Sequence, residues 1–192
     1  IQFLGTGTSQ GVPVIACDCI VCKSTDYKDK RLRSSILIEV EGRHIIVDTG
    51  PDFRYQMLRA NIQHLDAILM THSHKDHIAG LDDVRAFNYK QNESISIYTN
   101  EPTLEALKRE FYYAFSPLKY PGVPQLDLEE IHAGQPLFLF GHEIMPIEVM
   151  HYKMPVLGFR IGNFAYITDA KTVTQESRLV LQGVEVLVVN AL

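Results

Sequence analysis

The chain contains 192 residues, of which 46% are hydrophobic and 21% are charged, and it carries a formal net charge of −5. This length and composition predict one globular domain with a genuine core, and they exclude a disordered or fibrous chain. Acidic and basic residues are interspersed, which is not typical of a general nucleic-acid binder. No apolar run approaches the roughly 18 residues needed to span a membrane.

The first predicted strand is Gln2-Phe3-Leu4, which ends at Gly5-Thr6-Gly7-Thr8. Two glycines at a strand end permit a tight turn and a close approach of the backbone to a ligand. The stretch lacks the third glycine and the following helix of a dinucleotide-binding motif, so we reject that interpretation. Residues 9–33 then form a long irregular loop, which needs a local constraint to hold it.

Three cysteines, Cys17, Cys19 and Cys22, lie within six residues of this loop. An odd number at such close spacing is a poor disulfide framework. It indicates a reducing compartment and a metal, so we predict a cytoplasmic protein. Three thiolates supply three of the four ligands of a tetrahedral structural zinc. The alternative is three small buried thiols, because no fourth ligand is visible nearby.

Residues 35–40 and 44–47 are predicted to form the two strands of a β-hairpin. The hairpin places Asp48 at a strand end, where this residue is either functional or simply forms the turn. A short helix is predicted to begin near Pro51. The apolar face expected for this helix consists of Phe53, Met57 and Leu58.

The segment 71–77, with the sequence Thr-His-Ser-His-Lys-Asp-His, follows the apolar run 67–70, which is predicted to be a buried strand. His72 and His74 are two residues apart, so in an extended backbone both side chains point to one side. Asp76 and His77 follow where the chain begins to turn, and they can face the same point from another direction. Imidazole suits zinc, iron or manganese, and the added carboxylate favours a second, harder ion. The alternative is a polar loop with incidental histidines.

Further elements are predicted from the hydrophobic pattern of the remaining chain. Helices are expected at residues 80–91, after Asn100 and at 174–181, and strands at 95–98, 137–140, 144–150, 156–161, 164–168 and 184–189. His151 and Asp169 follow two of these strands. An ionised carboxylate beside a buried strand needs a partner, and a metal is a good one.

Together these residues resemble a known family, the metallo-β-lactamase-fold hydrolases. Its H-x-H-x-D-H motif is met in full by residues 72–77, and its first-strand aspartate is matched by Asp48 in VDTGPD. Its later histidine is matched by His151 and its last aspartate by Asp169 in YITDAK. Within this family, the Gly-Thr-Gly turn and the cysteine cluster resemble motifs of one branch. That branch contains the phosphoribosyl cyclic phosphodiesterase of phosphonate breakdown.

This resemblance implies a single α/β domain over residues 1–192 with four layers, αββα, in which two sheets pack face to face and helices lie outside. It also implies two divalent ions at one edge of the sheets, zinc or manganese first and iron or nickel next. The first ion would be bound by His72, His74 and His151. The second would be bound by Asp76 and His77, with Asp169 bridging both ions.

Two further roles follow from the resemblance. Asp76 and Asp48 are the carboxylates expected to matter for catalysis, with Asp48 orienting a histidine of the first metal site. Arg85 is a candidate contact for a substrate phosphate, although a surface ion pair with Asp82 is the alternative. The family's last metal histidine and the fourth ligand of the cysteine zinc have no counterpart after His151. We therefore expect that a C-terminal part lies beyond residue 192.

The function favoured by the sequence is hydrolysis of a small or cyclic phosphodiester by a hydroxide bound to two metal ions. A nuclease of the same fold is less favoured, because the lysines are scattered rather than arranged as a track for a strand. Hydrolysis of an ester, thioester or lactam is a third hypothesis, and a non-catalytic metal-binding scaffold is a fourth. We expect a small-molecule substrate and no membrane partner, and we leave a homodimer open.

Overall fold

Two β-sheets organise the chain, and the computed structural model describes residues 1–118 and 120–190. The first sheet has the order β1-β2-β3-β4-β5-β6. Its first three strands are antiparallel, and the pairs from β3 to β6 are parallel. The strands are β1 (Gln2–Gly5), β2 (Ser35–Val40), β3 (Arg43–Val47), β4 (Ala67–Leu69), β5 (Ile95–Thr99) and β6 (Leu126–Glu130).

The second sheet is mostly antiparallel and has the order β11-β8-β9-β10-β12, with β7 also paired to β8. The pair of β10 and β12 is parallel. The strands are β7 (Leu137–Leu139), β8 (His142–His151), β9 (Met154–Ile161), β10 (Phe164–Ile167), β11 (Thr172–Val173) and β12 (Val186–Val189).

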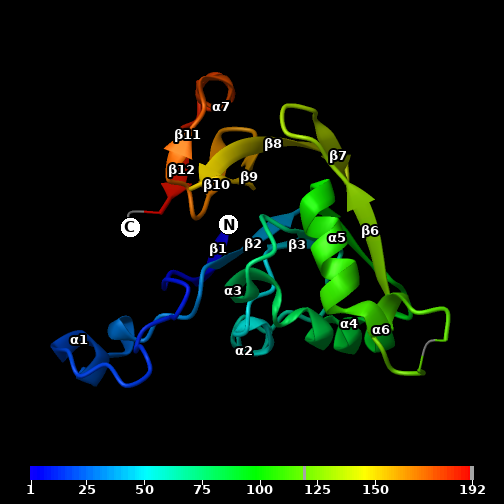
Figure 1. Ribbon diagram of the computed structural model, residues 1–192, viewed down its shortest axis with the longest axis horizontal. Coiled ribbons are helices and arrows are strands. Elements are labelled where there is room, and N and C mark those ends of the chain that lie inside the picture. The colour runs from blue at the N-terminus through cyan, green and yellow to red at the C-terminus, as the bar shows by residue number, and fades with distance from the viewer. Residues whose placement is uncertain (119, 191–192) are drawn as a thin grey trace.

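Helices cover the outer faces of both sheets, as Figure 1 shows. Beside the first sheet lie α2 (Phe53–Arg59), α3 (Lys75–Ile78), the 3-10 turn η2 (Leu81–Val84), α4 (Arg85–Gln91), α5 (Glu101–Glu110) and α6 (Tyr112–Phe115). Beside the second sheet lies α7 (Gln175–Val180). Residues 9–33 extend away from the sheets and contain α1 (Ile20–Lys23) and η1 (Tyr27–Asp29). Within the described ranges, no helix has the length and apolar character needed to cross a membrane.

Alternating side chains of the strands fill three separate cores. In β3, Ile45 and Val47 pack between the sheets, whereas Ile46 faces the helices of the first sheet. In β10, Tyr166 packs between the sheets, and Ala165 and Ile167 pack toward α7. This two-residue period places apolar side chains on both faces of each strand. The four-layer αββα arrangement predicted from the sequence is therefore confirmed.

Three details of the fold differ from the sequence-based expectation. Leu58, which was expected on the inner face of α2, is 61% exposed. Gln56 is buried on that face instead, and its Nε2 donates a hydrogen bond to the Arg33 carbonyl. The helix expected over residues 80–91 is divided into η2 and α4. Strand β6 was not predicted, because its sequence, Leu-Asp-Leu-Glu-Glu, is dominated by acidic residues, and its pairing with β5 outweighs that composition.

The ends of strands β3, β4, β8 and β10 converge on one edge of the molecule. Asp48 directly follows β3 and Asp169 closely follows β10, and both adopt positive φ angles of 64° and 58°. Gly50 then lets α3 approach closely, because a Cβ atom at this position would lie 2.1 Å from the Asp76 carbonyl oxygen. Glycine is therefore required for the contact that places the histidine segment against Asp48.

Candidate metal centre

The histidine segment and Asp169 form two groups of candidate metal ligands. The first group contains His72, His74 and Asp169, and the second contains Asp76, His77 and Asp169. Within each group, one ligand atom from every residue lies within 4.8 Å of the others. Because Asp169 belongs to both groups, its carboxylate is placed where it can contact two neighbouring ions.

His151 lies beside the first group, at the end of β8. The centre of its ring is 5.8 Å from that of His72 and 5.2 Å from that of His74. All four histidines and both aspartates that the resemblance assigned to the metals are thus gathered at one edge of the sheets. His72 and His77 are buried, His74 is exposed and His151 is half-buried.

Asp48 is fully buried and supports the histidine segment from the protein interior. Its Oδ1 accepts a hydrogen bond of 2.8 Å from the Thr71 amide, and its Oδ2 accepts one of 2.8 Å from the Thr71 hydroxyl. Oδ2 also lies 2.7 Å from His77 Nδ1. The direct histidine contact of Asp48 is therefore in the second group, and Asp48 reaches His72 of the first group through Thr71. Sequence reasoning missed Thr71, whose position directly before the motif was the available signal.

These hydrogen bonds fix which nitrogen of each histidine faces the site. The Thr71 hydroxyl donates its proton to Asp48, so it can only accept from His72 Nδ1, which lies 3.0 Å away. The lone pair of His72 is then on Nε2, a buried atom without a hydrogen-bond partner in the described part of the chain. His77 likewise donates from Nδ1 to Asp48 and turns Nε2 toward Asp76 and Asp169, each at 3.3 Å.

The charges at the site favour a bound cation. Burial opposes a charge on His77, but the carboxylates of Asp48, Asp169 and Asp76 outweigh it and raise its pKa to about 12. Burial and the neighbouring His77 lower the pKa of His72 to about 3. Although burial acts in the other direction, the hydrogen bonds to His77 lower the pKa of both Asp169 and Asp76. Two carboxylates, those of Asp76 and Asp169, and the unprotonated imidazole of His72 therefore face a small volume that suits divalent ions.

A cavity of about 830 Å³ opens beside these ligands. His74, Asp76, His77, His151 and Asp169 contribute to one side of its wall. Residues 5–9 contribute to the other side together with Arg31 and Ser34. The Gly-Thr-Gly-Thr turn therefore lies at the site, and the close contact that requires glycine at Gly5 is with the backbone of residues 32–33, because a Cβ atom there would lie 1.9 Å from the Arg33 carbonyl oxygen. Sequence reasoning missed Arg31, because no local pattern distinguishes it within the irregular loop.

Arg85 does not line this cavity. Its Nη1 atom lies 3.2 Å from Asp82 Oδ2 in an exposed ion pair one helical turn apart. Asp82 also accepts a hydrogen bond of 2.6 Å from the Tyr113 hydroxyl. The structure thus places Arg85 in the surface ion pair that was the alternative to phosphate contact. His132 and His142 lie near Glu130 and Glu41, away from the metal ligands.

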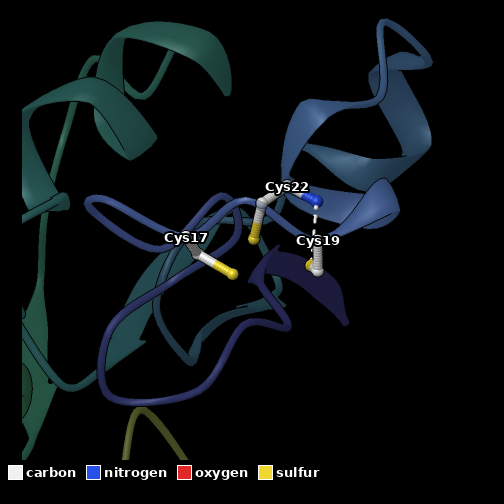
Figure 2. Close-up of side chains that lie close together, drawn as sticks. All are labelled: Cys17, Cys19 and Cys22. Atoms are coloured by element: carbon white, nitrogen blue, oxygen red, sulfur yellow. Dashed lines mark hydrogen bonds between the residues drawn. The ribbon is translucent and has the colours of Figure 1, made fainter.

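The three cysteines form a second candidate metal site in the arm of residues 9–33. Figure 2 shows Cys17, Cys19 and Cys22 close together, and one sulfur from each lies within 4.8 Å of the others. Cys19 caps α1 by accepting a hydrogen bond from the Cys22 amide. This hydrogen bond, together with one from the Cys17 thiol, lowers the pKa of Cys19 to about 7. A thiol that ionises near neutral pH suits a metal ligand.

A comparison with known families decides the identity of the fold. The family described as Beta-lactamase superfamily domain matches residues 43–192, which include all of the candidate ligands at the sheet edge. The chain belongs to the beta-lactamase superfamily. Its candidate metal ligands lie where the strand ends meet, and the fold implies divalent metal ions.

Three known proteins resemble the chain over nearly its full length. A solved diphosphatase of the PhnP family is 40% identical, has a TM-score of 0.89, and is matched over 97% of this chain and 70% of its own. The Zn²⁺-bound PqqB of Methylobacterium extorquens is 20% identical, has a TM-score of 0.78, and is matched over 99% of this chain and 72% of its own. An octanoyltransferase of Porphyromonas gingivalis is 40% identical over 99% of this chain, which spans only 38% of that protein.

Proposed function

We propose that the protein is a phosphodiesterase that uses two divalent metal ions to hydrolyse a small or cyclic phosphodiester. The observation that carries this proposal is the pair of three-residue ligand groups that share Asp169. Two ions held side by side suit an in-line displacement at phosphorus, in which both the attacking and the leaving oxygen need stabilisation. The similarity to a diphosphatase of the PhnP family supports phosphoryl rather than acyl chemistry.

In this proposal His72, His74 and His151 hold one ion, and Asp76 and His77 hold the other. Asp169 contacts both. When bound, the ions acidify a water molecule and offset charge on the phosphoryl oxygens. The chain keeps the ligands oriented for this role, because Asp48 and Thr71 accept hydrogen bonds from Nδ1 of His77 and His72 and so turn both Nε2 atoms toward Asp169.

The similarity to a solved diphosphatase of the PhnP family favours a second candidate function, which is hydrolysis of a diphosphate linkage. The same two ions would serve, because the reacting phosphorus is identical and only the leaving group differs. A nuclease has less support, since the net charge is −5 and, among the described residues, no basic track follows the cavity. The chain spans only 38% of the octanoyltransferase that it resembles. That similarity therefore adds no support for acyl chemistry here.

Metal-dependent hydrolysis of bis(4-nitrophenyl) phosphate tests the proposal. We expect no turnover after the whole protein is stripped of metal, and recovery when manganese or zinc is restored. A parallel assay with a nitrophenyl ester of a carboxylic acid gives the matched carbonyl substrate. Metal-dependent turnover of the carboxylic ester alone would contradict the proposal.

The cysteine cluster is proposed as a structural zinc site. It lies in the extended arm, separate from the candidate ligands at the sheet edge. Replacing Cys19 by Ser removes one thiolate, while the serine hydroxyl can still cap α1 by accepting from the Cys22 amide. We expect Cys19→Ser to lose one bound zinc and to lower the unfolding temperature, with kcat changed less than twofold. Ser24→Ala in the same arm is the control, and a Cys19→Ser protein as stable as its parent would contradict this assignment.

A further inference from the structure

The turn between β8 and β9 carries an aromatic residue in an unfavourable backbone conformation. His151 pairs with Met154, so Tyr152 and Lys153 form a two-residue hairpin loop. Tyr152 has a φ of 59°, in the left-handed region where such turns normally carry glycine or asparagine. A bulky side chain at this φ is a genuine outlier and lowers the stability of the turn.

Packing does not explain why a tyrosine occupies this position. Its side chain is 76% exposed, so the ring contributes little to any core. The Lys153 ammonium lies over the ring, 5.9 Å from its centre, so the exposed ring carries a positive charge beside it. Because the unfavourable conformation of Tyr152 is not offset by packing of its side chain, it points to a role other than folding.

The turn lies beside the candidate metal ligands. Tyr152 and Lys153 directly follow His151, and they line a cavity of about 400 Å³ together with His74, His151 and Met154. His74 and His151 also line the larger cavity that holds Asp76 and Asp169. The candidate metal centre therefore lies between two cavities, one of which has an aromatic wall. This cavity is shallow and open to solvent, so a group bound there would lie against the turn rather than be enclosed.

We infer that the Tyr152–Lys153 turn is a subsite for a nucleobase, so that the substrate is a nucleotide with the reacting phosphorus at the metal centre. The inference rests on the proposed phosphoryl chemistry. The face of Tyr152 stacks on the base, which is planar and aromatic, and the Lys153 ammonium lies beside the phosphate or ribose oxygens. An alkyl substituent would leave the tyrosine face without a matching surface.

Direct binding tests the inference without relying on turnover. Adenosine 5′-monophosphate and ribose 5-phosphate carry the same phosphate and sugar, and they differ only in the base. In calorimetric titrations of the metal-loaded protein, we expect the nucleotide to bind about 10-fold more tightly. Tyr152→Ala should remove this preference and leave ribose 5-phosphate binding unchanged, and Tyr152→Phe should retain it.

A second variant separates ligand binding from a purely structural role. Tyr152→Gly removes the ring and also relieves the positive φ, so it should raise the unfolding temperature while losing the preference for the nucleotide. Tyr112→Ala, which removes another exposed tyrosine on α6, is the control and should change neither. Equal affinity of the native protein for both ligands, or a preference that survives in Tyr152→Ala, would overturn the inference. If base discrimination is found but no phosphodiester is hydrolysed, the proposed function fails and the subsite stands.

Discussion

Replacing Asp48 by Asn is expected to weaken binding of both metal ions by about 10–100-fold, although Asp48 contacts neither ion. Its three hydrogen-bond partners, the Thr71 amide, the Thr71 hydroxyl and His77 Nδ1, all donate. An asparagine side chain has one acceptor oxygen, and its amide group would face at least one of these donors. The His77 ring would then lose its orientation, and Thr71 would no longer fix the Nδ1 proton of His72.

Asp66→Asn is a matched control for this variant. Asp66 is also buried, with 3% of its side chain exposed, and it lies at the opposite end of the same sheet. It accepts hydrogen bonds from Arg43 Nη1 at 2.8 Å and from the His44 amide at 2.7 Å. Asp48→Asn should lower the free energy of unfolding by about 1–3 kcal/mol, because it leaves a buried donor unpaired, and Asp66→Asn should lower it by less, because its donors are exposed or only partly buried. In titrations monitored by calorimetry, only Asp48→Asn should change metal affinity, and equal metal affinity in the two variants would contradict the role given to Asp48.

Replacing the two aspartates of the metal centre should have different effects on the number of bound ions. Asp76 belongs to one ligand group, whereas Asp169 belongs to both. Asp76→Ala should therefore retain one ion fewer than the parent, and Asp169→Ala two fewer. Turnover of the phosphodiester should fall by about 10³-fold in Asp76→Ala, which corresponds to a loss of about 4 kcal/mol of transition-state stabilisation, and it should be lost in Asp169→Ala, as in the protein stripped of metal.

The measurement is metal content after dialysis, determined by mass spectrometry, together with the turnover rate. Asp82→Ala is the control, because Asp82 is a carboxylate in the surface ion pair with Arg85 and lies outside both ligand groups. It should keep the parental metal content and rate. If Asp76→Ala retained every ion and full activity, the two-ion account would be wrong.

The metal-ligand segment was predictable because its information is local. The spacing of residues 72–77 behind an apolar run specifies both the ligand types and their direction, and Asp48, His151 and Asp169 each follow a recognisable strand. The layers were predictable from alternating apolar residues, as in β3 and β10. These features depend on neighbours within a few residues along the chain.

Features that depend on contacts between distant segments could not be predicted. That Asp48 accepts a hydrogen bond from His77, and has no direct bond with His72, depends on how β3 and α3 pack, which Gly50 permits. Strand β6 exists because β5 pairs with it, against the polar character of its own sequence. Arg31 reaches the cavity wall from the irregular arm, and the positive φ of Tyr152 has no signature in the residue type itself.

The central claim is that two metal ions at this site act together on a phosphodiester, and a manganese titration tests it most directly. Carboxylate and imidazole ligands accept manganese, whereas a thiolate cluster selects softer ions, so added manganese reports on the histidine and aspartate centre. The whole protein, stripped of metal, is titrated while bound manganese and bis(4-nitrophenyl) phosphate turnover are measured together. We predict that turnover rises with the second manganese ion bound per chain. Full turnover with a single ion, or none with two ions bound, would contradict the account.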